Sequence, residues 1–205
     1  MMLNELAQSL LNCQRCKLAK LGRTQVVFGV GNPNAAVMFV GEAPGFYEDK
    51  QGEPFVGAAG KLLNELLQSA GLSRSEIYIA NVIKCRPPNN RDPEPDEVET
   101  CKPFLLQQIE MIRPKLVCSL GNWATQTLLD KKVGITKVRG QVIRLEKFVL
   151  FPLLHPAAAL HQGNLREPLI EDFKKLKDYL LQTSASAPPP VASAAPAQPL
   201  QMDLF

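Results

Sequence analysis

The sequence predicts an α/β fold, a three-layer α/β/α sandwich around a mainly parallel central sheet. Short apolar runs bounded by turn residues alternate with longer segments of helical spacing, and no internal repeat occurs within residues 1–183. Successive strands separated by helices pair in parallel and carry helices on both faces of the sheet. Ligands of such folds bind at the carboxyl ends of the strands.

Four apolar runs have the length and composition of buried strands. They are residues 36–41, 77–83, 115–120 and 149–152. Helical spacing of apolar residues predicts helices over 61–70, 94–112 and about 167–182. Gly71 is a suitable stop for the first helix, and the Pro-Glu-Pro-Asp sequence suits the start of the second.

The composition changes abruptly at Ser184. Residues 184–200 are rich in Pro, Ala and Ser and carry no charge, so they cannot form a core and are predicted to be a disordered linker. The expected organisation is one folded domain over 1–183, the linker 184–200 and a terminal peptide 201–205.

The composition also bounds the cellular setting. The 205 residues are 45% hydrophobic and 21% charged, and no apolar run approaches the roughly 18 residues of a membrane span. The N-terminus lacks the basic region followed by a long apolar one that a secretory signal has, so we expect a cytoplasmic protein. We also expect a monomer. The net charge of +3 is too small to indicate a nucleic-acid partner by itself.

Polar side chains follow three of the predicted strands. Glu42 and Ala43 lie in the turn Gly41-Glu42-Ala43-Pro44-Gly45, Asn81 lies near the end of the second strand, and His155 follows the fourth. Each residue alone is compatible with an ordinary turn or loop. Because parallel strands end at the same edge, these groups are expected to meet there and form a site.

The chain has five cysteines, and in a reducing compartment an odd number of thiols is better explained by metal ligands than by disulfide bonds. Cys13 and Cys16 form a C-x2-C pair, whereas Cys85 and Cys101 stand alone. Four thiolates can hold zinc or an iron–sulfur cluster; this spacing favours a cluster without settling the metal, and four unconnected thiols are the alternative. Cys118 lies within a predicted strand and is expected to pack in the core.

Together these segments resemble the family 4 uracil-DNA glycosylases over residues 1–180. The matching motifs are GEAPG with a downstream ED (41–49), PFVG (54–57), NxxKCRPPxNR (81–91), TKVRG (136–140) and HPAA (155–158). The resemblance implies hydrolysis of the N-glycosidic bond of deoxyuridine in DNA, single- or double-stranded, by a monofunctional enzyme. It also implies that Cys13, Cys16, Cys85 and Cys101 hold a [4Fe–4S] cluster, for which we expect a structural role because the hydrolysis needs no electrons.

The resemblance assigns base recognition to Gly41, Ala43, Glu48, Phe55 and Asn81. Phe55 is expected to stack on uracil and Glu48 to lie against its C5 position. An amide such as that of Asn81 matches the O4 and N3–H groups of uracil, whereas cytosine presents the opposite pattern. A backbone amide in the Glu42–Ala43 turn is a further donor to the base.

Bond cleavage leaves positive charge on the sugar and negative charge on the departing base. His155 is the expected donor to O2 of the leaving uracil. Glu42 is the candidate carboxylate near the sugar, and Asn90 is an alternative or assisting group for the water; which of the two acts stays open.

Contacts with DNA are expected to be made mainly to phosphates. The nominated basic residues are Lys84, Arg86, Arg91, Lys137, Arg139 and Arg166. Leu160, in the histidine loop, is expected to fill the gap left by the flipped nucleotide. The terminal peptide, with Gln201, Leu204 and Phe205, resembles the motif by which bacterial proteins dock on the replication sliding clamp.

Two other functions remain compatible with parts of this pattern. A superfamily relative that traps DNA covalently would need a basic insertion near the histidine loop, which we do not find. A non-catalytic iron–sulfur adaptor would need the cysteines and the terminal peptide, but it gives no reason for Asn81 and His155 to stand at matching strand ends.

Overall fold

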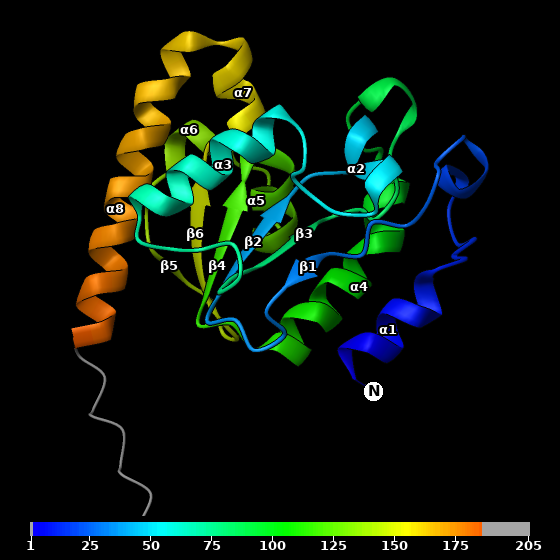
Figure 1. Cartoon of the computed structure of the whole chain (residues 1–205), viewed down its shortest axis with the longest axis horizontal. Helices are drawn as coiled ribbons and strands as arrows, with labels where there is room; N and C mark the ends of the chain where they lie inside the picture. The colour runs from blue at the N-terminus through cyan, green and yellow to red at the C-terminus, as the bar shows by residue number, and fades with distance from the viewer. Residues whose placement is uncertain (1, 186–205) are drawn as a thin grey trace, which may run out of the picture.

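The computed structural model describes residues 2–185. The terminal peptide 201–205 and all but the first two residues of the expected linker lie outside the described residues. Within them, the strands form one sheet in the order β1-β3-β2-β4-β6-β5 (Figure 1). None of the described helices is long and apolar enough to cross a membrane.

Four central strands pair in parallel and confirm the predicted ones. They are β2 (Val37–Gly41), β3 (Tyr78–Asn81), β4 (Leu116–Leu120) and β6 (Val149–Leu153). The edges of the sheet are two antiparallel pieces that were not predicted, β1 (Val30–Gly31) and β5 (Ile143–Arg144). Two residues are too few to show an alternating pattern.

The three predicted helices are present with slightly different ends, as α3 (Ala58–Ser69), α4 (Pro95–Ile112) and α8 (Arg166–Ala185). The unpredicted helices are α1 (Leu3–Leu10), α2 (Phe46–Gln51), α5 (Gly121–Leu129), α6 (Ile135–Val138) and α7 (Pro156–His161). Short 3₁₀ turns are η1 (Lys17–Lys20), η2 (Pro88–Asn90) and η3 (Gly163–Leu165).

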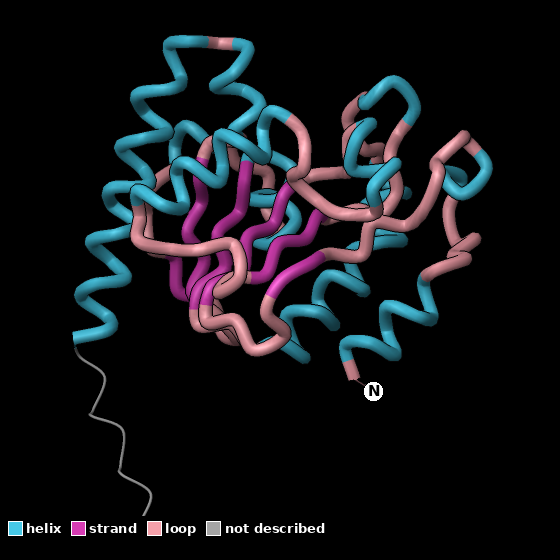
Figure 2. Tube along the Cα trace, viewed as in Figure 1, coloured by secondary structure: helices cyan, strands magenta, loops and turns pink. Residues whose placement is uncertain are grey.

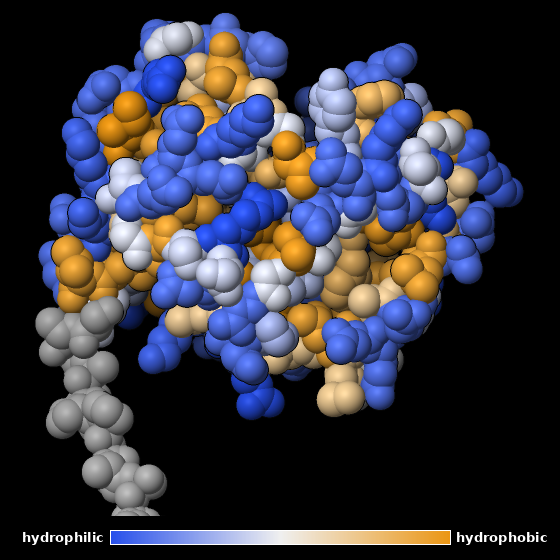
Figure 3. Space-filling view, in the orientation of Figure 1, coloured by the Kyte–Doolittle hydropathy of each residue, from blue (hydrophilic) through white to orange (hydrophobic). Residues whose placement is uncertain are grey.

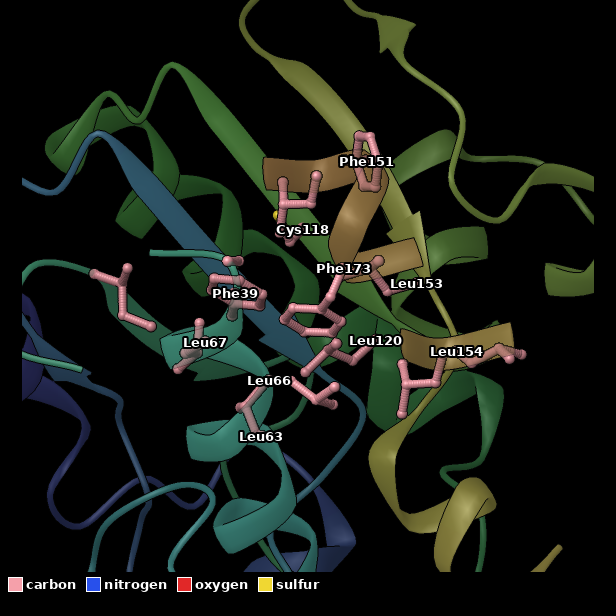
Figure 4. Packing of buried hydrophobic residues seen from close by; sticks show 14 of the residues in the cluster. Phe39, Leu63, Leu66, Leu67, Cys118, Leu120, Phe151, Leu153, Leu154 and Phe173 are labelled. Atoms are coloured by element: carbon pink, nitrogen blue, oxygen red, sulfur yellow. The ribbon is translucent and has the colours of Figure 1, made fainter. Parts of the chain in front are cut away.

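Side chains alternate between the two faces of the sheet and create two cores. Phe39 of β2 packs with α3 and α8 on one face, where its ring stacks on Phe173 at 6.2 Å (Figure 4). Met38 and Val40 face α4 and α5 on the other. The sheet therefore lies between two helical layers, which Figure 2 shows, and the predicted sandwich is confirmed.

Cys118 of β4 is fully buried in the first core, as expected for a small apolar residue (Figure 4). Burial raises the pKa of its thiol, so the neutral form persists at physiological pH. Cys118 thus packs in the core and lies apart from the other four cysteines.

The parallel register brings the site motifs together at one edge of the sheet. Gly41 at the end of β2 lies directly opposite Asn81 at the end of β3. Gly121, which follows β4 with φ of +87°, lies so close to His155 that a Cβ there would be 3.1 Å from the histidine Cβ. The sheet register therefore fixes how far apart the ends of β2, β3 and β6 lie, and with them the residues Glu42, Asn81 and His155.

Candidate functional site

A cavity of about 480 Å³ opens at this edge of the sheet. Its walls come from the turn and helix after β2, the segment around Phe55, the η2 loop and the start of α7. Figure 3 shows the surface hollowed between the part that carries α7 and the part that carries α2. Of the predicted residues, the cavity is lined by Glu42, Ala43, Glu48, Phe55, Asn90, Arg91 and His155.

Phe55 is held in a strained conformation at the floor of this cavity. Its φ of +57° lies in the left-handed region, which a bulky residue adopts only when its surroundings enforce it. Its N–H donates to Glu48 Oε1 at 2.7 Å, and its carbonyl accepts from Arg74 Nη1 at 3.2 Å. The buried ring lies against the His155 ring, with 5.7 Å between centroids and 29° between planes.

Glu48 acts as a brace between two segments of the cavity wall. One carboxylate oxygen accepts from the backbone N–H of Gly45, and the other accepts from that of Phe55. Burial raises the pKa of Glu48, and the two backbone donors counter part of that rise. The carboxylate is therefore fixed in place before any ligand arrives.

The Asn81 side chain is buried, with 1% of the residue exposed. Neither its Oδ1 nor its Nδ2 has a hydrogen-bond partner among the described residues. A Cβ on Gly41 would lie 2.3 Å from Asn81 Oδ1 and 2.8 Å from the Phe55 ring, so only glycine fits there. An unsatisfied buried amide costs about 1–3 kcal/mol for each group, so a ligand that paired with both groups would remove this cost.

His155 has a defined tautomer. It caps α7, and its Nδ1 accepts a hydrogen bond of 3.1 Å from the Ala157 backbone N–H. A ring nitrogen that accepts is unprotonated, so the proton of the neutral ring is on Nε2. Burial lowers the pKa of His155 to about 4, which keeps the ring neutral at physiological pH.

The two candidates for the water-activating role differ in their surroundings. Burial, with a smaller contribution from the Asp92 charge, raises the pKa of Glu42 to about 7. Asn90 is exposed, with φ of +55°, and its Oδ1 accepts a 2.7 Å hydrogen bond from Arg86 Nε. Glu42 is thus poised to take up a proton near neutral pH, whereas the Asn90 oxygen is already engaged.

The four predicted ligand cysteines lie around one small cavity, together with Leu10, Val26 and Phe104. Arg23 Nη1 donates to Cys85 Sγ at 2.7 Å, and the Lys84 backbone N–H donates to Cys101 Sγ at 3.3 Å. In residues 2–185 no three His, Cys, Asp or Glu side chains stand close enough to hold a single metal ion. Four thiols spread around an apolar cavity suit a group wider than one ion.

The nomination of Lys84 as a DNA contact is wrong. Only 2% of this residue is exposed, and its Nζ donates to the Asn81 carbonyl at 2.7 Å and to the Gln108 side chain. Gln108 in turn donates to the Phe28 carbonyl at 2.9 Å. Lys84 therefore supports the strand end that carries the Asn81 amide and cannot reach a phosphate from this position.

The other nominated basic residues occupy different environments. Arg139 is bound to α8, with 2.9 Å from its Nε to Asp172 and a further bond to the Pro168 carbonyl, so its charge is occupied within the fold. Arg91 lines the cavity but is paired with buried Glu97 at 2.6 Å. Arg86, Lys137 and Arg166 are partly or fully exposed.

The cavity is also lined by residues that we did not single out from the sequence, among them Phe46, Tyr47 and His161. Phe46 and Tyr47 follow the GEAPG turn immediately, and both are exposed. Two adjacent aromatic residues directly after a strand-end turn are the signal that identifies them.

Comparisons with known proteins agree with this geometry. Residues 28–178 match the model of the uracil DNA glycosylase superfamily. Two archaeal proteins named type-4 uracil-DNA glycosylase match most of the chain. The one from Sulfurisphaera tokodaii is 48% identical over 188 residues, 87% of this chain and 85% of the relative. The one from Archaeoglobus fulgidus is 47% identical over 182 residues, 85% and 91% of the two chains.

A protein of the same name from Thermotoga maritima is 48% identical over 172 residues, 82% of this chain and 89% of the relative. These matches cover the strand-end turn, the Asn81 strand and the histidine loop together, and so confirm the resemblance drawn from the motifs. The chain therefore belongs to the uracil-DNA glycosylase superfamily and, within it, to the type-4 uracil-DNA glycosylases.

Proposed function

We propose that this protein flips deoxyuridine out of DNA and hydrolyses its N-glycosidic bond, leaving free uracil and an abasic site that starts base-excision repair. The observation that carries the proposal is the buried, unpartnered amide of Asn81, which meets Phe55 of the cavity lining around Gly41. A base within a duplex cannot reach such a pocket, so the nucleotide must leave the stack.

Asn81 supplies the discrimination between bases. Its Nδ2 donates to uracil O4 and its Oδ1 accepts from N3–H, which satisfies both orphaned groups. Cytosine has a donor where uracil has O4 and an acceptor where uracil has N3–H, so both groups would stay unpaired. Glu48, braced against the cavity wall, excludes the C5 methyl of thymine.

Phe55 supplies the ring on which uracil stacks, and its strained backbone is held by hydrogen bonds with Glu48 and Arg74. We place the O2 edge of the stacked base toward His155, whose ring centroid lies 5.7 Å from that of Phe55.

His155 and Glu42 carry the charge separation of bond cleavage. The neutral His155 ring donates from Nε2 to O2 as negative charge develops on the leaving uracil, and a backbone N–H of the Glu42–Ala43 turn is a second donor. The ionised Glu42 carboxylate favours the sugar cation and accepts a proton from the attacking water, with Asn90 assisting.

The reaction stops at the abasic site. A lyase step needs an amine that attacks the sugar, and no lysine is among the described residues that line the cavity. The nearest lysine in sequence to the recognition residue, Lys84, is buried and engaged with the Asn81 carbonyl and Gln108. We therefore propose a monofunctional enzyme.

The proposed recognition is tested by Asn81→Ala on a single-uracil oligonucleotide, with strand breakage by alkali as the measure of abasic sites. We expect kcat/KM to fall about 100-fold or more because two hydrogen bonds to the base are lost. Asn4→Ala, on the exposed face of α1, is the control and retains full activity. Near-normal cleavage by Asn81→Ala removes the residue from recognition, and no cleavage by the unchanged protein refutes the function.

The proposed division of roles predicts a particular pH profile. Glu42 must be ionised, so the single-turnover rate rises with pH through about 7, the pKa of this group. His155 is neutral above about pH 4 and therefore adds no step near its ordinary value. We expect Glu42→Gln to be at least about 100-fold slower with a flat profile.

His155→Gln is expected to be slow as well, yet to keep the rise near pH 7 because Glu42 is unchanged. A rise that survives in Glu42→Gln assigns the titration to another group and overturns this division of roles.

We further propose that Cys13, Cys16, Cys85 and Cys101 hold a [4Fe–4S] cluster with a structural role. The apolar cavity that they share and the donors to two of the sulfurs fit such a group. When bound, the cluster supplies a link between the N-terminal segment and the strand end that carries Asn81. Hydrolysis needs no electrons, so no catalytic step depends on it.

Removing one ligand tests this assignment. We expect Cys101→Ala to lack the brown colour and the iron and sulfide of the unchanged protein, and its Tm to fall by about 10 °C or more. The matched control is Cys118→Ala, which loses core packing but keeps the colour and the iron. Zinc without sulfide, or an unaltered iron content in Cys101→Ala, contradicts the proposal.

For DNA we propose phosphate contacts by Arg86, Arg91, Lys137 and Arg166, without Lys84 and Arg139. Phosphate contacts bind DNA of any sequence. The affinity falls as the salt concentration rises, because binding releases counterions from the DNA. Leu160, which is 46% exposed on α7, is proposed to fill the gap left by the flipped nucleotide.

We also propose a cytoplasmic monomer tethered to the replication sliding clamp through Gln201, Leu204 and Phe205. Helix α8 begins beside α7 and runs for 20 residues, about 30 Å, so its C-terminal end lies away from the cavity (Figure 1).

Deleting residues 201–205 is expected to abolish clamp binding, measured by surface-immobilised clamp, and to leave cleavage of a short oligonucleotide within about twofold. Clamp binding that persists after the deletion places the contact elsewhere.

A further inference from the structure

Helix α2 places two aromatic side chains at the mouth of the cavity. Phe46 is 43% exposed and Tyr47 is 61% exposed, and both line the cavity. Their rings meet edge to face, with centroids 5.3 Å apart and 84° between planes. Adjoining exposed aromatic residues beside a cavity are characteristic of binding surfaces rather than of a solvated helix.

Two cations flank the same pair. The Arg86 guanidinium lies 5.0 Å from the centroid of the Phe46 ring, and Lys50 Nζ lies 5.0 Å from it as well. Arg86 is also fixed by its 2.7 Å hydrogen bond to Asn90. Phe46 thus contacts both the Tyr47 ring and the two cations, while the Tyr47 ring is the more exposed of the two aromatic rings.

The start of α7 supplies the opposite rim of the mouth. Leu160 of α7 is 46% exposed, and His161 beside it lines the cavity. A DNA strand that delivers a nucleotide into the cavity must pass between these rims, so the nucleotides on either side of the target lie next to them. Aromatic faces with nearby cations are the combination that holds unstacked bases and their phosphates.

We propose that Tyr47, supported by Phe46, forms a subsite that stacks on the base adjacent to the flipped deoxyuridine, with Arg86 and Lys50 on the intervening phosphate. The proposal rests on the glycosylase function proposed above and adds a residue that holds the strand, not the target base. Stacking on a neighbouring base requires no particular sequence, since every base has a π-face.

The test uses an oligonucleotide with a non-cleavable deoxyuridine analogue and the fluorescent base 2-aminopurine on its 5′ side or, in a second oligonucleotide, on its 3′ side. Stacking on an aromatic ring quenches this fluorophore. We expect quenching on binding at one of the two positions. Tyr47→Leu should lose the quenching and raise the Kd about 10-fold, and Tyr47→Phe should restore both.

Leu106→Ala is the matched control, since Leu106 is exposed on α4, away from the cavity lining, and should behave as the unchanged protein. Quenching that persists in Tyr47→Leu, or no quenching at either position, overturns the subsite. Both outcomes are independent of the cleavage assay, in which failure of the unchanged protein overturns the glycosylase function instead. Equal Tm values for the two Tyr47 variants exclude a folding defect.

Discussion

The close approach of Gly41, Asn81 and Phe55 is the constraint on which the site depends. The parallel register of β2 and β3 sets Gly41 opposite Asn81, and the missing Cβ leaves room for both the amide and the aromatic ring. The strained backbone of Phe55 and the orphaned amide both oppose folding. Their cost is offset by the two cores and by the hydrogen bonds of Glu48, Arg74 and Lys84 around them.

These supports separate residues that touch the base from residues that position them. Lys84 holds the carbonyl of Asn81 and so fixes the backbone behind that recognition side chain without meeting the base. Glu48 has both parts, because it holds the N–H of Phe55 and is also the proposed neighbour of the C5 position. Arg139 has a comparable part at α8, where it bonds to Asp172 and Pro168. A motif position in this fold can therefore be needed for geometry without meeting the substrate.

The sequence was sufficient to predict the four buried strands and the meeting of their polar ends, because continuous apolar runs and parallel pairing leave few alternatives. Helices α2 and α7 were missed since six residues after a turn show no helical period. The predicted contact of Lys84 with DNA was wrong because a lysine is usually exposed. Its burial becomes visible only through its hydrogen bonds to Asn81 and Gln108. The Phe55 conformation likewise has no sequence pattern.

The thiol cavity has a consequence for the order of folding. Its residues come from the N-terminal segment, the end of β3 and helix α4, so it unites Cys13 with Cys101 across almost half of the described chain. Contacts between such distant residues form after local ones, since the intervening chain must first become ordered. The β2–β3 pairing and α4 must therefore form before the four thiols can surround one cavity, so that insertion of the proposed iron–sulfur cluster would be a late step that closes an already assembled domain.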